Sequence, residues 1–280
     1  MEDKLLRDFI TRSLAEDEGD GDHSSLACIP DDLKGQARLI IKQNGLIAGV
    51  RVAREVFSII DQKIDFSLFI EDGTPVKPGD IAFHISGSIH SILKSERLVL
   101  NIMQRMSGIA TSTNEYVTRL KGLKTKILDT RKTSPGLRFL EKEAVRIGGA
   151  LNHRMGLYDM IMLKDNHIDY AGGIENAIKS TSEYLRNNKL NIKVEIEARS
   201  INDIERIISA GGIDRIMLDN FNLVNTRAAV KLIKGRYETE SSGGITLETI
   251  RSYAECGVDY ISVGALTHHI KSLDMSLKAF

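Results

Sequence analysis

The residues best suited to chemistry stand where short apolar runs of the sequence end. Arg131 and Lys132, between two threonines, follow one run, and Lys164 follows the next without a break. Arginine holds carboxylate or phosphate oxygens as a two-pronged donor. A lysine at the end of a buried strand is costly unless it is paired or binds an anion. These cations predict a site for an anionic ligand, to which His153 and Arg154 could contribute.

Carboxylates end the two runs that come next. Glu195 and Glu197 alternate along one run, so they point to the same side of a strand, and Asp219 ends the following run. A buried strand would avoid two carboxylates, so we expect these acids to face a barrel mouth, cations or a metal. They could bind Mg²⁺, hold ribose hydroxyls or stabilise a cationic transition state. The alternative is a structural salt bridge to Lys132 or Lys164.

Glycines and small residues end the last two runs, around Gly243 and Gly264. Glycine lets phosphate oxygens approach backbone N–H groups, and phosphate sites after the last two strands recur in βα-barrels. Cations, carboxylates and bare backbone together suit a phosphate ester whose reacting carbon becomes positive. We interpret His167 as a cap or turn residue, and His268 and His269 as structural or surface residues.

The elements that must position these residues form a βα pattern. Short apolar runs alternate with segments of helical character, which predicts a barrel with its chemistry at the carboxyl ends of the strands. Only six units are clear, so we predict an incomplete barrel. The runs are 126–133, 159–167, 193–198, 215–220, 237–244 and 259–265, and the helices lie near 135–148, 173–186, 202–210, 223–234 and 247–255.

The sequence before the barrel predicts a small α+β domain. We expect a helix over 5–14, an acidic loop over 16–25, a hairpin around Asn44-Gly45 and a helix over 51–60. A long helix from about 95 to 121 leads into the first barrel strand. We place the domains at 1–110 and 111–269, and expect the tail 270–280 to pack on the first.

Composition limits the partners and the compartment. The net charge of the 280 residues is zero, which does not indicate nucleic acid or a membrane surface as a partner. The segment 121–167 nevertheless carries ten Lys/Arg against five Asp/Glu, which favours a small anionic ligand. Two distant cysteines, Cys28 and Cys256, and the absence of a signal-like apolar core favour a cytoplasmic protein.

Several motifs, in order over nearly the whole chain, carry a family resemblance. They closely resemble quinolinate phosphoribosyltransferase, the carboxylating nicotinate-nucleotide pyrophosphorylase family. The motifs are EDEGDGDHSS, SERLVLNIMQRMSGIAT, LDTRKTSPGLRFLEKEAVRIGGALNHRMGLYDMIMLKDNH, VEIEARS, IMLDNF, ESSGGIT and SLDMSLKAF.

The resemblance implies an N-terminal α/β sandwich domain, a C-terminal incomplete α/β barrel, and a homodimer with shared active sites. It implies that Arg97 enters the partner's site, that Mg²⁺ is the cofactor, and that the catalytic residues are Lys132, Lys164, Glu197 and Asp219. Quinolinate contacts would fall to Arg97, Arg131, Lys132, Thr133, His153, Arg154 and Lys164. Glu197 and Asp219 would hold ribose and Mg²⁺, and Ser242, Gly243, Gly244, Gly264, Ala265 and Leu266 would hold phosphate.

The implied reaction is pentosyl transfer from phosphoribosyl diphosphate to quinolinate with loss of CO₂, a step of NAD biosynthesis. The proton donor to C2 stays open between Lys132 and a water molecule. Three alternatives remain: a transferase of the same fold for nicotinate or another ring acid, a Schiff-base aldolase that uses Lys132 or Lys164, and a non-catalytic nucleotide-binding protein.

Overall fold

The computed structural model describes residues 2–280, which form two units. The first unit comprises the chain up to Asn114, the segment Ser134–Gly149 and the tail His269–Phe280. The second comprises Glu115–Thr133 and Ala150–His268. The structure differs from the predicted boundary at residue 110 and from the predicted place of residues 134–149 in the barrel.

The contacts of α5 (Arg138–Ile147) explain why this segment belongs to the first unit. The fully buried Glu141 of α5 accepts hydrogen bonds from Arg105 on the long helix α4 (Ile89–Arg119), at 2.6 Å from Nη2 and 2.9 Å from Nε. A buried carboxylate needs such a partner. The sequence pattern predicts the helix, but it does not predict which helix packs against its buried face.

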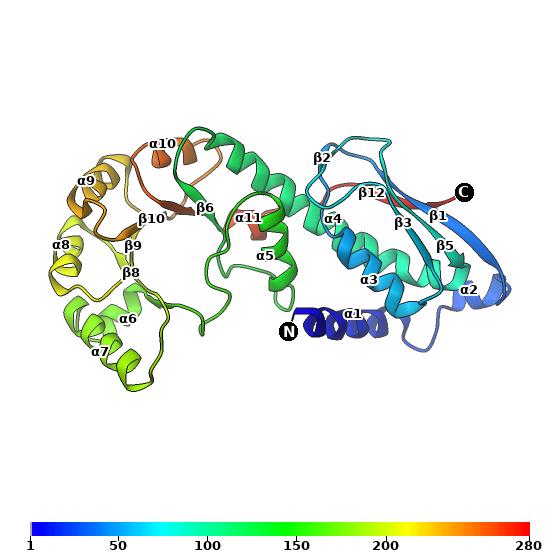
Figure 1. Cartoon of the computed structure of the whole chain (residues 1–280), viewed down its shortest axis with the longest axis horizontal. Helices are drawn as coiled ribbons and strands as arrows, with labels where there is room; N and C mark the ends of the chain where they lie inside the picture. The colour runs from blue at the N-terminus through cyan, green and yellow to red at the C-terminus, as the bar shows by residue number, and fades with distance from the viewer. Residues whose placement is uncertain (1) are drawn as a thin grey trace. The chain divides into compact units, whose positions relative to one another are not determined.

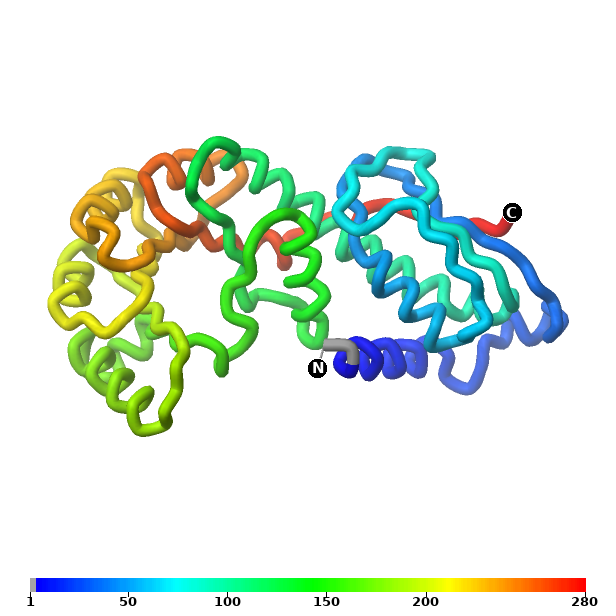
Figure 2. Tube along the Cα trace, in the orientation of Figure 1, coloured from blue at the N-terminus to red at the C-terminus, as the bar shows by residue number. Residues whose placement is uncertain are grey.

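The first unit contains an antiparallel sheet of four strands in the order β12-β1-β5-β3. Helix α3 (Val50–Ile60) packs on the sheet through Phe57, whose ring centroid lies 6.0 Å from that of Phe66 and 6.1 Å from that of Phe83. The tail forms β12 and runs antiparallel beside β1 (Figure 2). The strands are β1 (Lys34–Ile41), β3 (Asp65–Leu68), β5 (Ile81–Ser88) and β12 (Met275–Ala279).

Two local predictions in this unit were wrong. Asn44-Gly45 does not connect a hairpin, because β1 pairs with β5 and β12 while β2 (Gly45–Leu46) pairs with β4 (Pro75–Val76). The acidic stretch 16–25 is mostly helical, because α1 (Glu2–Glu18) runs into it and α2 (His23–Cys28) begins at its end. The Asp22 side chain caps α2 by accepting the Ser25 N–H at 3.2 Å.

The second unit is the predicted incomplete barrel. Its described residues form six parallel strands in the order β6-β11-β10-β9-β8-β7, with helices outside them (Figure 1). The strands are β6 (Lys126–Leu128), β7 (Ile161–Leu163), β8 (Val194–Ala198), β9 (Arg215–Asp219), β10 (Glu238–Ser242) and β11 (Tyr260–Ser262). The helices are α6 (Asp165–Tyr170), α7 (Ile174–Asn187), α8 (Ile201–Ala210), α9 (Leu223–Ile233), α10 (Ile250–Ala254) and α11 (Ala265–His268).

The barrel is open between β6 and β7, the two edge strands of the sheet. Beside β6 runs the connection that leads to β7, and Leu151 in it forms a parallel bridge with Leu128. The Leu151 N–H also donates to the Ile127 carbonyl at 2.9 Å. A short extended segment therefore stands where a further strand would close the barrel. Among residues 2–280, no helix combines the length and apolarity needed to cross a membrane.

Candidate active site

A cavity of about 610 Å³ lies at the carboxyl ends of the barrel strands. Its lining comes from the residues that follow β6, β7, β9, β10 and β11, together with side chains from within the strands and from the segment before β7. Of the predicted site residues, it includes Arg131, Lys132, His153, Arg154, Lys164, Glu197, Asp219, Ser242, Gly243, Gly244, Gly264 and Ala265.

Three predicted site residues do not line this cavity. Thr133 is the last residue of its segment of the second unit, and Leu266 is fully buried in α11. Arg97 lies exposed on α4 in the first unit. We predicted Leu266 at the phosphate site because it follows Gly264 and Ala265. Its side chain is instead buried in the protein interior.

The lysine at the end of β7 and the second glutamate of β8 form an ion pair. Lys164 Nζ contacts Glu197 Oε1, and the Asp165 N–H donates to Glu197 Oε2 at 3.0 Å. Nδ1 of His167 accepts the Lys164 N–H at 3.0 Å, so His167 caps the start of α6 as predicted. The salt-bridge alternative is thus realised at Glu197, with both partners still lining the cavity.

Asp219 is the acid at the end of β9. Its carboxylate accepts a hydrogen bond from the Asn220 side-chain amide at 2.8 Å. Burial, followed by the negative charge of Glu197, raises its pKa above the ordinary value of an aspartate. A carboxylate whose charge is disfavoured by its surroundings is suited to a cation that approaches from the cavity.

The glycines after β10 and β11 leave room for neighbouring side chains to lie close to the backbone. Gly243 has a φ of 98°, and a Cβ at this position would collide with the Asn220 side-chain oxygen. A Cβ at Gly264 would lie 3.0 Å from Nε2 of His268 and 3.1 Å from Cδ of Lys132. His268 is exposed and lines the cavity, a position that our interpretation of it as a structural or surface residue did not include. Its distance of four residues from Gly264, one helical turn, was the available signal.

The segment before β7 is fixed to the end of β6 by Asp129. This fully buried carboxylate accepts the His153 backbone N–H at 2.8 Å and the Asn152 side-chain amide at 2.6 Å. His153 and Arg154 thereby take their places in the wall of the cavity. Burial, followed by the positive charge of Arg131, lowers the pKa of Arg154. The positive charges of Arg131 and Arg154 therefore oppose one another on this side of the cavity.

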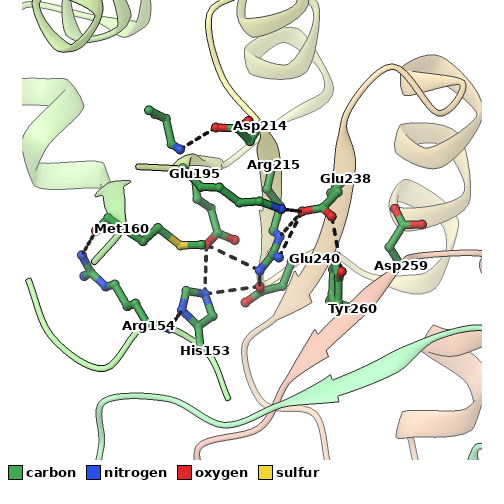
Figure 3. A network of polar contacts seen from close by, with 12 residues as sticks. His153, Arg154, Met160, Glu195, Asp214, Arg215, Glu238, Glu240, Asp259 and Tyr260 are labelled. Atoms are coloured by element: carbon green, nitrogen blue, oxygen red, sulfur yellow. Dashed lines mark hydrogen bonds and ion pairs between the residues drawn. The ribbon is translucent and has the colours of Figure 1, made fainter. Parts of the chain in front are cut away.

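A second group of charges lies inside the barrel, and Figure 3 shows it. It contains His153, Glu195, Arg215 and Glu240, all buried. Sequence reasoning assigned no role to Arg215 or Glu240. Glu240 itself lines the cavity, and its alternation with Ser242 along β10 was the available signal for an inward-facing side chain.

Two sequence models of one family match consecutive parts of the chain. Residues 22–107 match the N-terminal domain, and residues 109–278 the C-terminal domain, of quinolinate phosphoribosyl transferase. The chain belongs to the quinolinate phosphoribosyltransferase family. The two matched parts of this family meet within α4.

Similar members of the family include plant and bacterial proteins. The chain is 43% identical to quinolinate phosphoribosyltransferase [decarboxylating] 2b, mitochondrial, of Nicotiana tabacum, over 98% of this chain and 82% of that protein. It is 42% identical to a probable nicotinate-nucleotide pyrophosphorylase [carboxylating] of Bacillus subtilis, over 97% and 92%. The crystal structure of NadC from Streptococcus pyogenes superposes with a TM-score of 0.93 at 39% identity, over 98% and 97%.

Proposed function

We propose that this member of the quinolinate phosphoribosyltransferase family transfers the phosphoribosyl group of phosphoribosyl diphosphate to the ring nitrogen of quinolinate. The products are nicotinate mononucleotide, diphosphate and CO₂, and the enzyme is a pentosyltransferase of NAD biosynthesis. One observation carries the proposal: a single cavity brings together clustered cations, two carboxylates and glycine backbone. Family membership supports the same reaction.

The cationic wall is suited to a dicarboxylate. Arg131, Lys132 and Arg154 line the cavity, and Lys164 completes the wall from β7. Because Arg131 lowers the pKa of Arg154, the two cations repel one another, and a dianion between them would relieve that repulsion. Quinolinate held there by two carboxylates would direct its ring nitrogen at one place, which is the positioning that an enzyme supplies.

The carboxylates are suited to the ribose. When diphosphate leaves, C1 of ribose becomes oxocarbenium-like, and carboxylates already in place stabilise that charge. Asp219 and Glu197 line the cavity together. Glu197 is held by Lys164 and the Asp165 N–H, so its carboxylate cannot turn away from the cavity. After N-alkylation the ring accepts the electrons of the breaking C2–carboxylate bond, and C2 is then protonated.

Mg²⁺ would be held chiefly by Asp219. Its carboxylate faces the cavity and has a raised pKa, whereas both oxygens of Glu197 already have partners. The donor set therefore fits a hydrated Mg²⁺ bound directly by Asp219 and indirectly by Glu197. When bound, Mg²⁺ would neutralise the charge of the diphosphate. The glycines at 243, 244 and 264 would leave their N–H groups open to the phosphate.

We further propose a homodimer in which Arg97 acts in the partner's site. Its exposed guanidinium on α4 supports a role outside its own unit. Mixing Arg97→Ala with Lys164→Ala protein should restore part of the activity, because a hybrid dimer would hold one site free of both changes. No recovery after demonstrated subunit exchange would contradict the shared site. Free thiols at Cys28 and Cys256 support a cytoplasmic, reducing compartment.

The decisive experiment measures CO₂ and diphosphate release from carboxyl-labelled quinolinate, phosphoribosyl diphosphate and Mg²⁺. The Lys132 side chain is exposed and lines the cavity, so Lys132→Ala should stay folded. This variant should lose turnover and serves as the control for activity from the site. Equal or faster reaction with nicotinate would favour a different acceptor acid. Trapping of a substrate adduct by borohydride would favour Schiff-base chemistry. Binding of phosphoribosyl diphosphate without release of diphosphate would contradict an enzymatic role.

A further inference from the structure

Beneath the cationic wall, four ionisable side chains meet inside the barrel (Figure 3). His153 Nε2 lies 2.9 Å from Glu195 Oε2 and 3.4 Å from Glu240 Oε2. Arg215 Nη1 lies 3.0 Å from the same Glu240 oxygen and 4.0 Å from Glu195 Oε2. The side chains of His153 and Arg215 are 4% and 7% exposed, and both glutamates are 0% exposed. The substrate-binding reaction proposed above assigns no role to Glu240 or Arg215.

Two buried carboxylates and one buried guanidinium surround the Nε2 side of His153. Negative charge is costly in this place, and burial, followed by the negative charge of Glu240, raises the pKa of Glu195 to about 7. Nε2 of the imidazole faces both carboxylates. A proton on Nε2 is therefore the hydrogen-bond donor that the ring offers to them. A proton on Nε2 between the two carboxylate oxygens favours one orientation of the ring.

The other ring nitrogen has a different neighbour. The backbone N–H of Arg154 donates to His153 Nδ1 at 2.7 Å, and an amide N–H cannot reverse its role. Burial lowers the pKa of His153, but the two carboxylates outweigh burial and raise it to about 9, while the Arg154 N–H opposes a second proton on Nδ1. In either protonation state, Nε2 keeps its proton.

The same geometry argues against a metal ion in this cluster, although His153, Glu195 and Glu240 offer ligand atoms within 4.8 Å of one another. A metal would need the lone pair of Nε2, which carries the proton as long as Nδ1 accepts the Arg154 N–H. Arg215 already supplies a cation 3.0 Å from Glu240.

We infer that Glu240, Glu195 and Arg215 are positioning residues, which hold the His153 imidazole with its Nε2–H turned into the barrel and so fix the quinolinate wall. The inference rests on the proposed function. The link to the wall is short: the fixed ring receives the Arg154 N–H, and Arg154 Nη1 donates to the Met160 carbonyl at 3.2 Å. Turning the ring would displace the start of the segment that carries Arg154 into the cavity.

The chain offers a matched pair of variants on one strand. Glu240→Gln removes the carboxylate shared by His153 and Arg215. Glu238→Gln, two residues away on β10, also removes a partner of Arg215, at 3.1 Å, but none of His153. Both variants lose one contact of the same guanidinium. Glu238 also contacts Lys193 and the Tyr260 hydroxyl, whereas Glu240 is fully buried and lines the cavity, so the state of the His153 ring is measured beside the kinetics.

Steady-state kinetics and nitrogen NMR of histidine-labelled protein give the two readouts. In Glu240→Gln we expect the KM for quinolinate to rise about tenfold, with the KM for phosphoribosyl diphosphate within about twofold of the wild type. In Glu238→Gln both constants should stay within about twofold. The NMR signals of His153 should show a protonated Nε2 and an accepting Nδ1 in the wild type, and should shift in Glu240→Gln only.

Each result decides one question. Equal kinetic effects of the two variants, or a wild-type His153 without a proton on Nε2, would overturn the inference. The NMR measurement uses the ligand-free wild type, so it stands even if Glu240→Gln does not fold. Failure of the wild type to release CO₂ from quinolinate would overturn the proposed function alone. A stoichiometric metal in the purified wild type that is lost in Glu240→Gln would also refute the positioning role.

Discussion

An exchange of two side chains should test how the wall of the cavity is held. Asp129 accepts the His153 N–H at 2.8 Å and the Asn152 side-chain amide at 2.6 Å, from a position that is 0% exposed. Asp129→Asn can keep the first bond through its amide oxygen, but it turns an NH₂ group toward the NH₂ group of Asn152. In the double variant Asp129→Asn/Asn152→Asp, donor and acceptor face each other again.

The magnitude follows from the lost hydrogen bond. A hydrogen bond to a charged group contributes about 1.5–3 kcal/mol, and a buried donor without its acceptor costs about as much. We therefore expect Asp129→Asn to lower the free energy of unfolding by about 2 kcal/mol. The exchange should recover most of this loss. The coupling in a double-mutant cycle should therefore be at least about 2 kcal/mol, because the cost of Asn152→Asp adds to it.

Urea unfolding of the four proteins measures the coupling, and kcat/KM for quinolinate reports on the wall itself. Asp129→Asn should lose activity at temperatures where it is still folded, and the exchange should regain it. Strictly additive effects of the two substitutions, with no recovery in the double variant, would show that Asp129 does not act through Asn152. The argument for the wall would then be refuted.

Three further results are expected. Gly243→Ala should lower the free energy of unfolding by about 1 kcal/mol or more and raise the KM for phosphoribosyl diphosphate, because φ is 98° and the new Cβ meets Asn220. A variant with the stability and kinetics of the wild type would contradict this. Glu197→Gln should lower the pKa of Asp219, since removing a negative neighbour favours the ionised form; an unchanged carboxyl NMR titration would refute it. Chelation of Mg²⁺ should stop diphosphate release until Mg²⁺ is added back, and activity in excess chelator would exclude the ion.

Some features of the site can be read directly from the sequence. A strand has a period of two, and in a parallel barrel every strand delivers its last residues to the same edge. For this reason Lys132, Lys164, Glu197 and Asp219 could be placed at one cavity from the order of the apolar runs. The open barrel was predictable from the small number of βα units.

Pairing between distant segments could not be read in this way. Asn44-Gly45 has the sequence of a hairpin turn, but β1 gains more by pairing with β5 and with β12 from the end of the chain. A turn signal reports local backbone preference, whereas the partner of a strand depends on which buried surfaces fit together.

By itself, the sequence determined the order of cations, acids and glycines along the strand ends, because that order is fixed by the chain and by the period of the strand. Only the tertiary structure decided which charges meet. It paired Lys164 with Glu197, and it placed Glu240 and Arg215 beneath His153. Burial makes unpaired charge costly, so the partners are selected by where the folded barrel brings them together, and no spacing along the chain records that choice.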